Sequence, residues 1–135
     1  MKLVLGKEVI ETLKTIARNS NIEVCGLLLG TREGETYRVL EVREIENRLK
    51  RPDAFEMEPL EMVKVLDEAE RRGLEVVGIF HSHLNCPPVP SGRDLEGMKN
   101  WPVVWLIVTG DEARAWVLRD GLEEVEVRAT EGDVH

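Results

Sequence analysis

The 135-residue sequence contains no glutamine, few aromatic residues and only three histidines. Aromatic residues make up 4% of the chain, and two of the histidines, His81 and His83, lie almost side by side, whereas the third is the last residue. The absence of glutamine beside abundant glutamate, lysine and arginine is typical of thermophilic proteins. Because both interior histidines stand in one short segment, we expect the chemistry of the protein there.

Two further absences narrow the classes of function. No apolar run approaches the roughly 20 residues of a membrane-spanning helix, so we expect no membrane partner. Residues 1–7 lack the long apolar stretch and the cleavage site of a signal peptide, which favours a cytoplasmic location. The net charge of −8 argues against a nucleic-acid partner, because phosphate contacts need clustered lysine and arginine.

The composition, 42% hydrophobic and 33% charged, fits a single globular domain over residues 1–135. Apolar residues at helical spacing predict helices over 7–18 and 59–72, with a short third helix over 91–99. Apolar or alternating runs predict strands over 23–29, 36–45, 76–80, 103–108, 113–118 and 122–128, with a turn at 31–35 and a loop at 46–57. This order predicts an α/β protein in which helices flank a mixed β-sheet.

The segment His81-Ser82-His83 follows the predicted strand 76–80. Strand residues two apart point the same way, so both imidazoles can reach one metal ion at about 2.0–2.1 Å. With the carboxylate of Asp94, they would form a set of three ligands that leaves one position for water, which is the composition of a catalytic zinc site. The alternative, ordinary loop or core histidines, is less favoured because the two share one face.

Ser91 and Asp94 have a second interpretation. Ser-x-x-Asp after a proline-rich loop is also close to a helix capping box, in which Ser91 caps the helix and Asp94 lies in its first turn. The Asp94 carboxylate can take part in the capping box and still bind a metal, because the cap would fix the helical turn that directs this carboxylate. Whether the Ser91 hydroxyl caps the helix or faces a substrate stays open from the sequence.

Hydrolysis at such a centre needs a proton acceptor that is not a metal ligand, and Glu23 is the candidate. It opens an otherwise apolar strand, where a single carboxylate is unusual. The alternative is a solvated glutamate at the end of a strand, and charge alone favours that alternative.

Glu23 and the pattern His-Ser-His-x7-Ser-x2-Asp over residues 81–94 resemble the JAMM (MPN+) metalloprotease family. The resemblance covers nearly the whole chain and implies the curved mixed sheet of the JAMM/MPN, cytidine-deaminase-like, fold. It implies Zn²⁺ held by His81, His83, Asp94 and a water, with Glu23 moving the proton of that water and Ser91 stabilising the oxyanion.

The resemblance also implies the substrate. Family members cleave isopeptide bonds between the Gly-Gly C-terminus of a ubiquitin-like protein and a lysine amine. The chain is similar to small single-domain archaeal members, so its expected partners are archaeal small modifier proteins and their conjugates. A homodimer stays open, because no long exposed apolar seam marks an interface.

Two other functions compete with the isopeptidase. One is a peptidase that processes a sulfur-carrier ubiquitin-like protein, and the other is a non-catalytic MPN scaffold, which typically lacks some of the ligands present here. A zinc-dependent nucleobase deaminase would need His-x-Glu and Cys-x-x-Cys, and the sequence has neither.

The sequence departs from the family at Leu84, where a proline often follows the second histidine, and at Cys86 within the motif loop. Leu84 is expected to change only the shape of the loop. Cys25 lies two residues from Glu23 and Cys86 three residues from His83, so both thiols are expected near the metal. We expect a disulfide or a close thiol pair, which intracellular proteins of hyperthermophiles tolerate.

Overall fold

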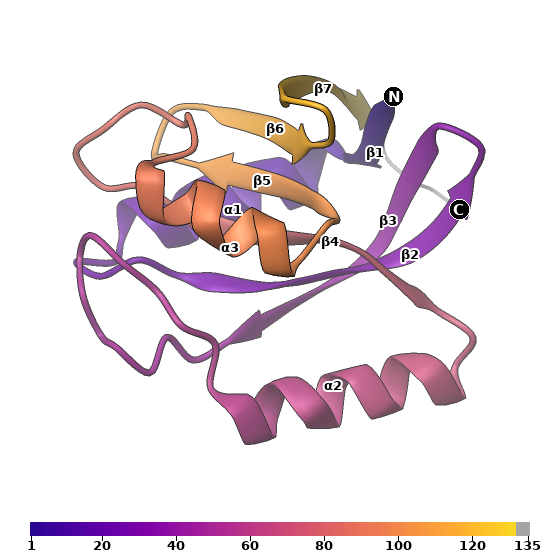
Figure 1. Cartoon of the computed structure of the whole chain (residues 1–135), viewed down its shortest axis with the longest axis horizontal. Helices are drawn as coiled ribbons and strands as arrows, with labels where there is room; N and C mark the ends of the chain where they lie inside the picture. The colour runs from indigo at the N-terminus through magenta and orange to yellow at the C-terminus, as the bar shows by residue number, and fades with distance from the viewer. Residues whose placement is uncertain (132–135) are drawn as a thin grey trace.

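The computed structural model describes residues 1–131 (Figure 1). The helices are α1 (Lys7–Arg18), α2 (Pro59–Arg71) and α3 (Gly92–Asn100). The strands are β1 (Lys2–Gly6), β2 (Cys25–Glu33), β3 (Thr36–Ile45), β4 (Glu75–Ser82), β5 (Val104–Val108), β6 (Ala113–Leu118) and β7 (Leu122–Thr130). The predicted combination of helices with strands is confirmed.

The strands form one mixed sheet that closes into a barrel in the order β1-β3-β2-β4-β5-β6-β7. Parallel pairs join β1 to β3, β1 to β7 and β4 to β5, and the remaining pairs are antiparallel. The mixed sheet was predicted, but its closure was not. The closure depends on β1, a strand that sequence analysis missed because Leu3, Val4 and Leu5 are all buried and show no alternation.

Three boundaries differ from the prediction in ways that matter for the site. Strand β2 begins at Cys25, so Glu23 precedes it, and it continues to Glu33 because the turn is confined to Gly34 and its neighbour. Gly34 has a φ of 63°, which glycine adopts without steric cost. Strand β4 extends through Ser82, so His81 belongs to the strand itself.

Alternating residues of the central strands belong to two separate apolar clusters, one on each face of the sheet. Leu28 and Phe80 pack with side chains of α1 on one face, whereas Leu27 and Ile79 pack on the other face in the cluster that includes side chains of α2 and α3. The three helices are labelled on the ribbon in Figure 1. His81 comes two residues after Ile79 in the same strand, so its side chain points to the same face of the sheet, the face that α2 and α3 cover. Within residues 1–131, no helix is long and apolar enough to cross a membrane.

Gly26 is a point of close approach between β2 and β3. A Cβ atom at this position would lie 2.2 Å from the carbonyl oxygen of Arg43 and 2.5 Å from the ring of Phe80. We therefore expect Gly26→Ala to lower the free energy of unfolding by about 1–3 kcal/mol, measured by denaturant titration. Gly92→Ala is the matched control, since its Cβ would meet nothing within 4 Å, and equal stabilities of the two variants would contradict the argument.

Candidate metal centre

The structure brings His81 and His83 together at the end of β4. His81 lies opposite Cys25 in β2 and Ile107 in β5, and the backbone N–H of His83 donates to the carbonyl of Val108 over 2.9 Å. Both side chains are buried, and their ring centroids are 5.0 Å apart. Pairing with strands on both sides therefore fixes the backbone that carries the two imidazoles.

Backbone carbonyls orient both rings. His83 Nδ1 lies 2.8 Å from the carbonyl oxygen of Pro87, and His81 Nδ1 lies 3.3 Å from that of Ser82. A carbonyl oxygen only accepts hydrogen bonds, so each Nδ1 carries a hydrogen and each Nε2 faces the shared centre. Within residues 1–131, the buried Nε2 of His81 has no hydrogen-bond partner, which is costly unless another group binds it there.

Asp94 supplies the third group. Its Oδ1 lies 3.1 Å from His81 Nε2, although not in hydrogen-bond geometry, and its Oδ2 lies 3.0 Å from His83 Nε2. Burial by itself would raise the pKa of Asp94, but the interactions with His81 and His83 outweigh it and hold this pKa far below its usual value. Two imidazole nitrogens and a carboxylate thus converge as the donor set of a metal ion would.

Glu23 is the second buried carboxylate. Only 5% of its surface is exposed, so the alternative of a solvated glutamate is wrong. Its Oε1 lies 3.5 Å from His81 Nδ1, and Glu23, His81 and His83 can place ligand atoms within 4.8 Å of one another, close enough to hold a metal ion. Asp94 fits better as the ligand of an ion at Nε2, because Glu23 faces the Nδ1 side of His81.

The capping interpretation of Ser91 is confirmed. Ser91 Oγ accepts a hydrogen bond of 3.1 Å from the backbone N–H of Asp94, and Asp94 Oδ2 accepts one of 3.0 Å from the backbone N–H of Ser91. Capping uses only a lone pair of the hydroxyl. Its hydrogen has no acceptor within the part of the chain that the structure describes, and Ser91 is exposed, so the cap leaves the O–H free to donate.

Phe55 is the residue of this centre that sequence reasoning missed. Its ring stacks on the imidazole of His81 with centroids 4.6 Å apart, and Trp105 meets His81 edge-on at 5.7 Å. The segment 46–57 was predicted as a loop, and none of its residues was assigned to the metal centre. An aromatic residue inside a polar loop of a chain with so few aromatics was the available signal.

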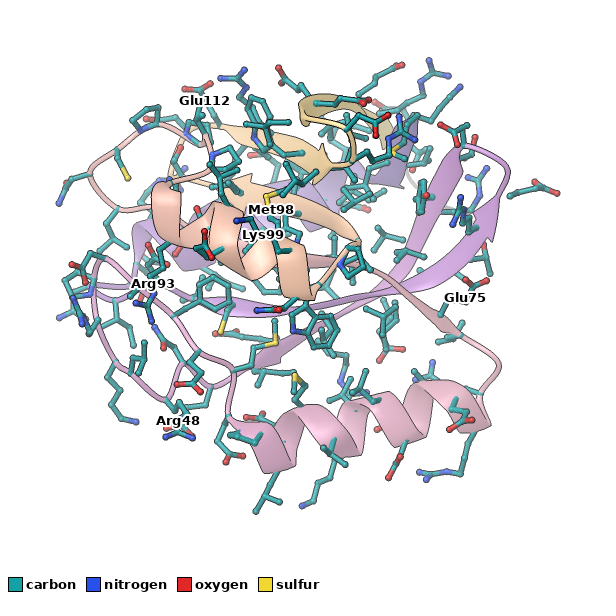
Figure 2. The ribbon with its side chains drawn as sticks, in the orientation of Figure 1. Arg48, Glu75, Arg93, Met98, Lys99 and Glu112 are labelled. Atoms are coloured by element: carbon teal, nitrogen blue, oxygen red, sulfur yellow. The ribbon has the colours of Figure 1, made fainter. Side chains whose placement is uncertain are left out.

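A hollow of about 570 Å³ opens beside Asp94, between the Phe55 segment and α3. Arg93, at the start of α3, lines this hollow together with residues of the Phe55 segment and is labelled in Figure 2. The residues around the hollow include Asp53, Phe55, Arg93, Asp94, Trp101 and Trp105. Phe55, Trp101 and Trp105 also border an adjoining hollow of about 290 Å³. An elongated, partly apolar ligand could therefore reach the metal centre from this side.

The predicted disulfide between Cys25 and Cys86 is wrong, because both residues are free thiols. Cys25 is buried and its Sγ donates to the carbonyl of Ile45 over 3.4 Å, whereas Cys86 is exposed on the motif loop. Burial, with the nearby Glu44 and Glu23, raises the pKa of the Cys25 thiol to about 12. Proximity along the chain did not bring the two thiols into a bond, because Cys25 points into the core.

The carboxylates also set the protonation of the imidazoles. Burial disfavours a charged His81, but Asp94 and Glu23 outweigh burial and raise its pKa to about 9. The pKa of His83 is also raised, since Asp94 and the Pro87 carbonyl outweigh burial. At neutral pH, a proton on His81 therefore competes with a metal for the ring nitrogen.

This competition predicts that zinc affinity rises with pH. Because the metal must displace a proton from His81, the association constant should increase about tenfold per pH unit for each displaced proton up to pH ~9 and flatten above it. Competition titrations against a chelator, corrected for the protonation of the chelator, measure this slope. A constant affinity between pH 6 and pH 9 would contradict the raised pKa.

Comparisons with known proteins identify the family of this chain. Residues 7–119 match the family described as prokaryotic homologs of the JAB domain. The chain is 50% identical over 127 residues to a desampylase of Pyrococcus furiosus, covering 93% of this chain and 88% of that protein. It is 34% identical over 113 residues to a probable TtuB-protein conjugate cleaving protease of Thermus thermophilus, covering 84% and 73%.

A solved relative shares the fold. The solution structure of protein DSY2949 from Desulfitobacterium hafniense matches with a TM-score of 0.83 and 28% identity, covering 96% of this chain and 94% of that one. The match to the family and the identity to the desampylase agree with the resemblance drawn from Glu23 and residues 81–94. The chain belongs to the JAB-domain family of JAMM proteins, in its prokaryotic branch.

Proposed function

We propose that this chain is a zinc-dependent isopeptidase that hydrolyses the bond between the Gly-Gly C-terminus of a ubiquitin-like modifier and a lysine amine of its target. The observation that carries the proposal is the convergence of two imidazoles and a carboxylate on one buried point, with a second carboxylate beside it. The names of the relatives, a desampylase and a protease of TtuB conjugates, support small modifiers of this class as substrates.

His81 and His83, through their Nε2 atoms, and Asp94 would hold the zinc ion. The partnerless Nε2 of His81 and the shared Asp94 carboxylate fit this role. When bound, zinc supplies a Lewis acid for the scissile carbonyl and a bound water whose pKa is near 7. The carbonyl contacts at both Nδ1 atoms keep the rings in the orientation that zinc requires.

Glu23 is proposed as the general base and acid. Its carboxylate is buried beside His81, so it can take a proton from the attacking water and return it to the leaving lysine amine. The flanking backbone holds the side chain there, because the Glu23 N–H donates to the carbonyl of Arg51 over 2.9 Å. A base held by packing and backbone hydrogen bonds needs little rearrangement during the reaction.

Ser91 is proposed to stabilise the oxyanion. Its hydroxyl accepts from the Asp94 N–H and retains a free hydrogen, so a single side chain can cap α3 and donate to developing negative charge. The same cap fixes the first turn of α3, which carries the Asp94 carboxylate toward the histidines. The two roles that competed in the sequence are therefore compatible.

The hollow between the Phe55 segment and α3 is proposed as the path of the modifier's tail. Asp94 is one of its lining residues, and Phe55, Trp101 and Trp105 contribute apolar side chains to the lining. An extended tail with glycines at its end would fit such a path, because glycine lets the backbone approach the centre closely. The lysine side of the conjugate would then leave on the side of Glu23.

Glu23→Gln tests the base. The variant should keep its zinc, because Glu23 is not a proposed ligand, and its kcat on a modifier–lysine conjugate should fall by about 10²–10⁴-fold. Cleavage is followed by gel or mass spectrometry, with zinc content measured on the same samples. Asp94→Asn is the comparison that should lose zinc as well as activity. Wild-type cleavage that persists in Glu23→Gln would remove Glu23 from the mechanism.

Ser91 is tested by separating its two roles. Ser91→Thr keeps both the capping oxygen and the hydroxyl hydrogen, whereas Ser91→Gly removes the hydroxyl at a helix cost of only a few tenths of a kcal/mol. We expect Thr to retain most of the activity and Gly to lose about 10²–10³-fold in kcat while melting near the wild-type temperature. A Gly variant with wild-type kcat would leave Ser91 with the capping role alone.

A further inference from the structure

Asn47 is a buried polar side chain with no part in the reaction described above. It lies just after β3 and is 4% exposed. Its Nδ2 donates to the carbonyl of Glu23 over 2.9 Å and to that of Ala54 over 3.0 Å. Its Oδ1 accepts from the backbone N–H of Leu49 over 3.0 Å and from that of Glu56 over 3.1 Å. The amide thus uses both donor hydrogens and both acceptor positions.

These four bonds join two segments that meet at His81. One segment carries Glu23, whose carboxylate lies beside His81 Nδ1, and the other carries Phe55, whose ring stacks on the same imidazole. The carbonyls that Asn47 binds belong to Glu23 itself and to Ala54, the neighbour of Phe55. A displacement of Asn47 would therefore move the proposed base and the aromatic cover of its imidazole together.

The surrounding backbone bonds alone leave this connection incomplete. The loop closes on itself through the bonds from Arg48 N–H to the Glu56 carbonyl and from Glu58 N–H to the Glu46 carbonyl, both 2.9 Å. Among residues 1–131, the hydrogen bonds that link this loop to Glu23 are one backbone bond, from Glu23 N–H to the Arg51 carbonyl, and the bond from the Asn47 amide. The amide is thus the side chain that connects the closed loop to the base.

We propose that Asn47 is a positioning residue that holds the Glu23 backbone against the 47–58 segment. This contact keeps both the Glu23 carboxylate and the Phe55 ring in their positions beside the His81 ring. The inference rests on the proposed hydrolase function for its kinetic consequence, but its structural content is independent of activity. An asparagine suits this position because it alone offers two hydrogens to the two carbonyls and an oxygen to the two N–H groups at this short length.

Asn47→Asp tests the proposal. The variant keeps an oxygen for Leu49 and Glu56 but turns a second oxygen toward the carbonyls of Glu23 and Ala54. We expect kcat on a modifier–lysine conjugate to fall about 10–100-fold with zinc content unchanged, because a catalytic group displaced by about 1 Å loses rate of this order. Asn21→Asp, an exposed position with the same change of charge, should keep the wild-type kcat.

A double-mutant cycle distinguishes positioning from general destabilisation. If Asn47 acts through Glu23, adding Asn47→Asp to Glu23→Gln should lower kcat by less than about twofold further. If the kcat losses of the two single variants multiply in full in the double variant, Asn47 has a merely structural role and the proposal is overturned. Asn47→Ser, which removes the amide without adding charge, repeats the cycle if the aspartate variant does not fold.

Amide hydrogen exchange supplies a readout that needs no activity. In Asn47→Asp and in Asn47→Ser, the N–H of Glu23 should exchange at least about tenfold faster than in the wild type, while those of Phe80 and Leu106 in the central strands stay unchanged. In Asn47→Ser, which loses the acceptor oxygen of the amide, the N–H of Glu56 should also exchange faster. Unchanged exchange at Glu23 would overturn the positioning role. A wild type that cleaves no modifier conjugate would overturn the proposed function instead and leave this exchange result to decide the role of Asn47.

Discussion

The pairing of β2 with β4 is the constraint on which the centre depends. Cys25 lies opposite His81, and just beyond this pair the Ser82 N–H donates to the Val24 carbonyl over 3.0 Å while Ser82 Oγ accepts from the Val24 N–H over 2.9 Å. A slip of one residue would turn His81 to the face of α1 and carry Glu23 away from it. The buried serine between the two histidines therefore secures the register that brings Glu23 and His81 together.

The centre also concentrates charge in a way that stability alone does not explain. Glu23, His81, His83 and Asp94 are all at most 5% exposed. Removing charged groups from water costs free energy that mutual attraction only partly returns, so a well-packed apolar cluster would serve the fold equally well. Two carboxylates that face two imidazoles lower the cost, and a bound cation would lower it further. The stability of the core therefore does not by itself account for these four residues.

The sequence predicted the cluster of His81, His83 and Asp94 better than its surroundings, for a physical reason. The two-residue spacing of His81 and His83 and the three-residue spacing of the capping box are local, and strand and helix geometry translate them directly into direction. Strand β1 and the stacking of Phe55 on His81 depend on contacts between distant segments, which no local pattern reports. The failed cysteine pairing has the same origin, since distance along the chain did not report that Cys25 points into the core.

Several of the few aromatic residues of this chain lie close to the two imidazoles or to the loop that orients them. Of two phenylalanines, three tryptophans and one tyrosine, Phe55 and Trp105 contact the His81 ring. Trp116 acts at a greater distance, because its Nε1–H donates to the Pro88 carbonyl over 2.9 Å and so holds the proline-rich loop whose Pro87 carbonyl orients His83. Large rigid rings lose little conformational entropy when they are fixed and can still offer one polar contact. Half of the six aromatic residues of this chain thus help to hold the two imidazoles in place.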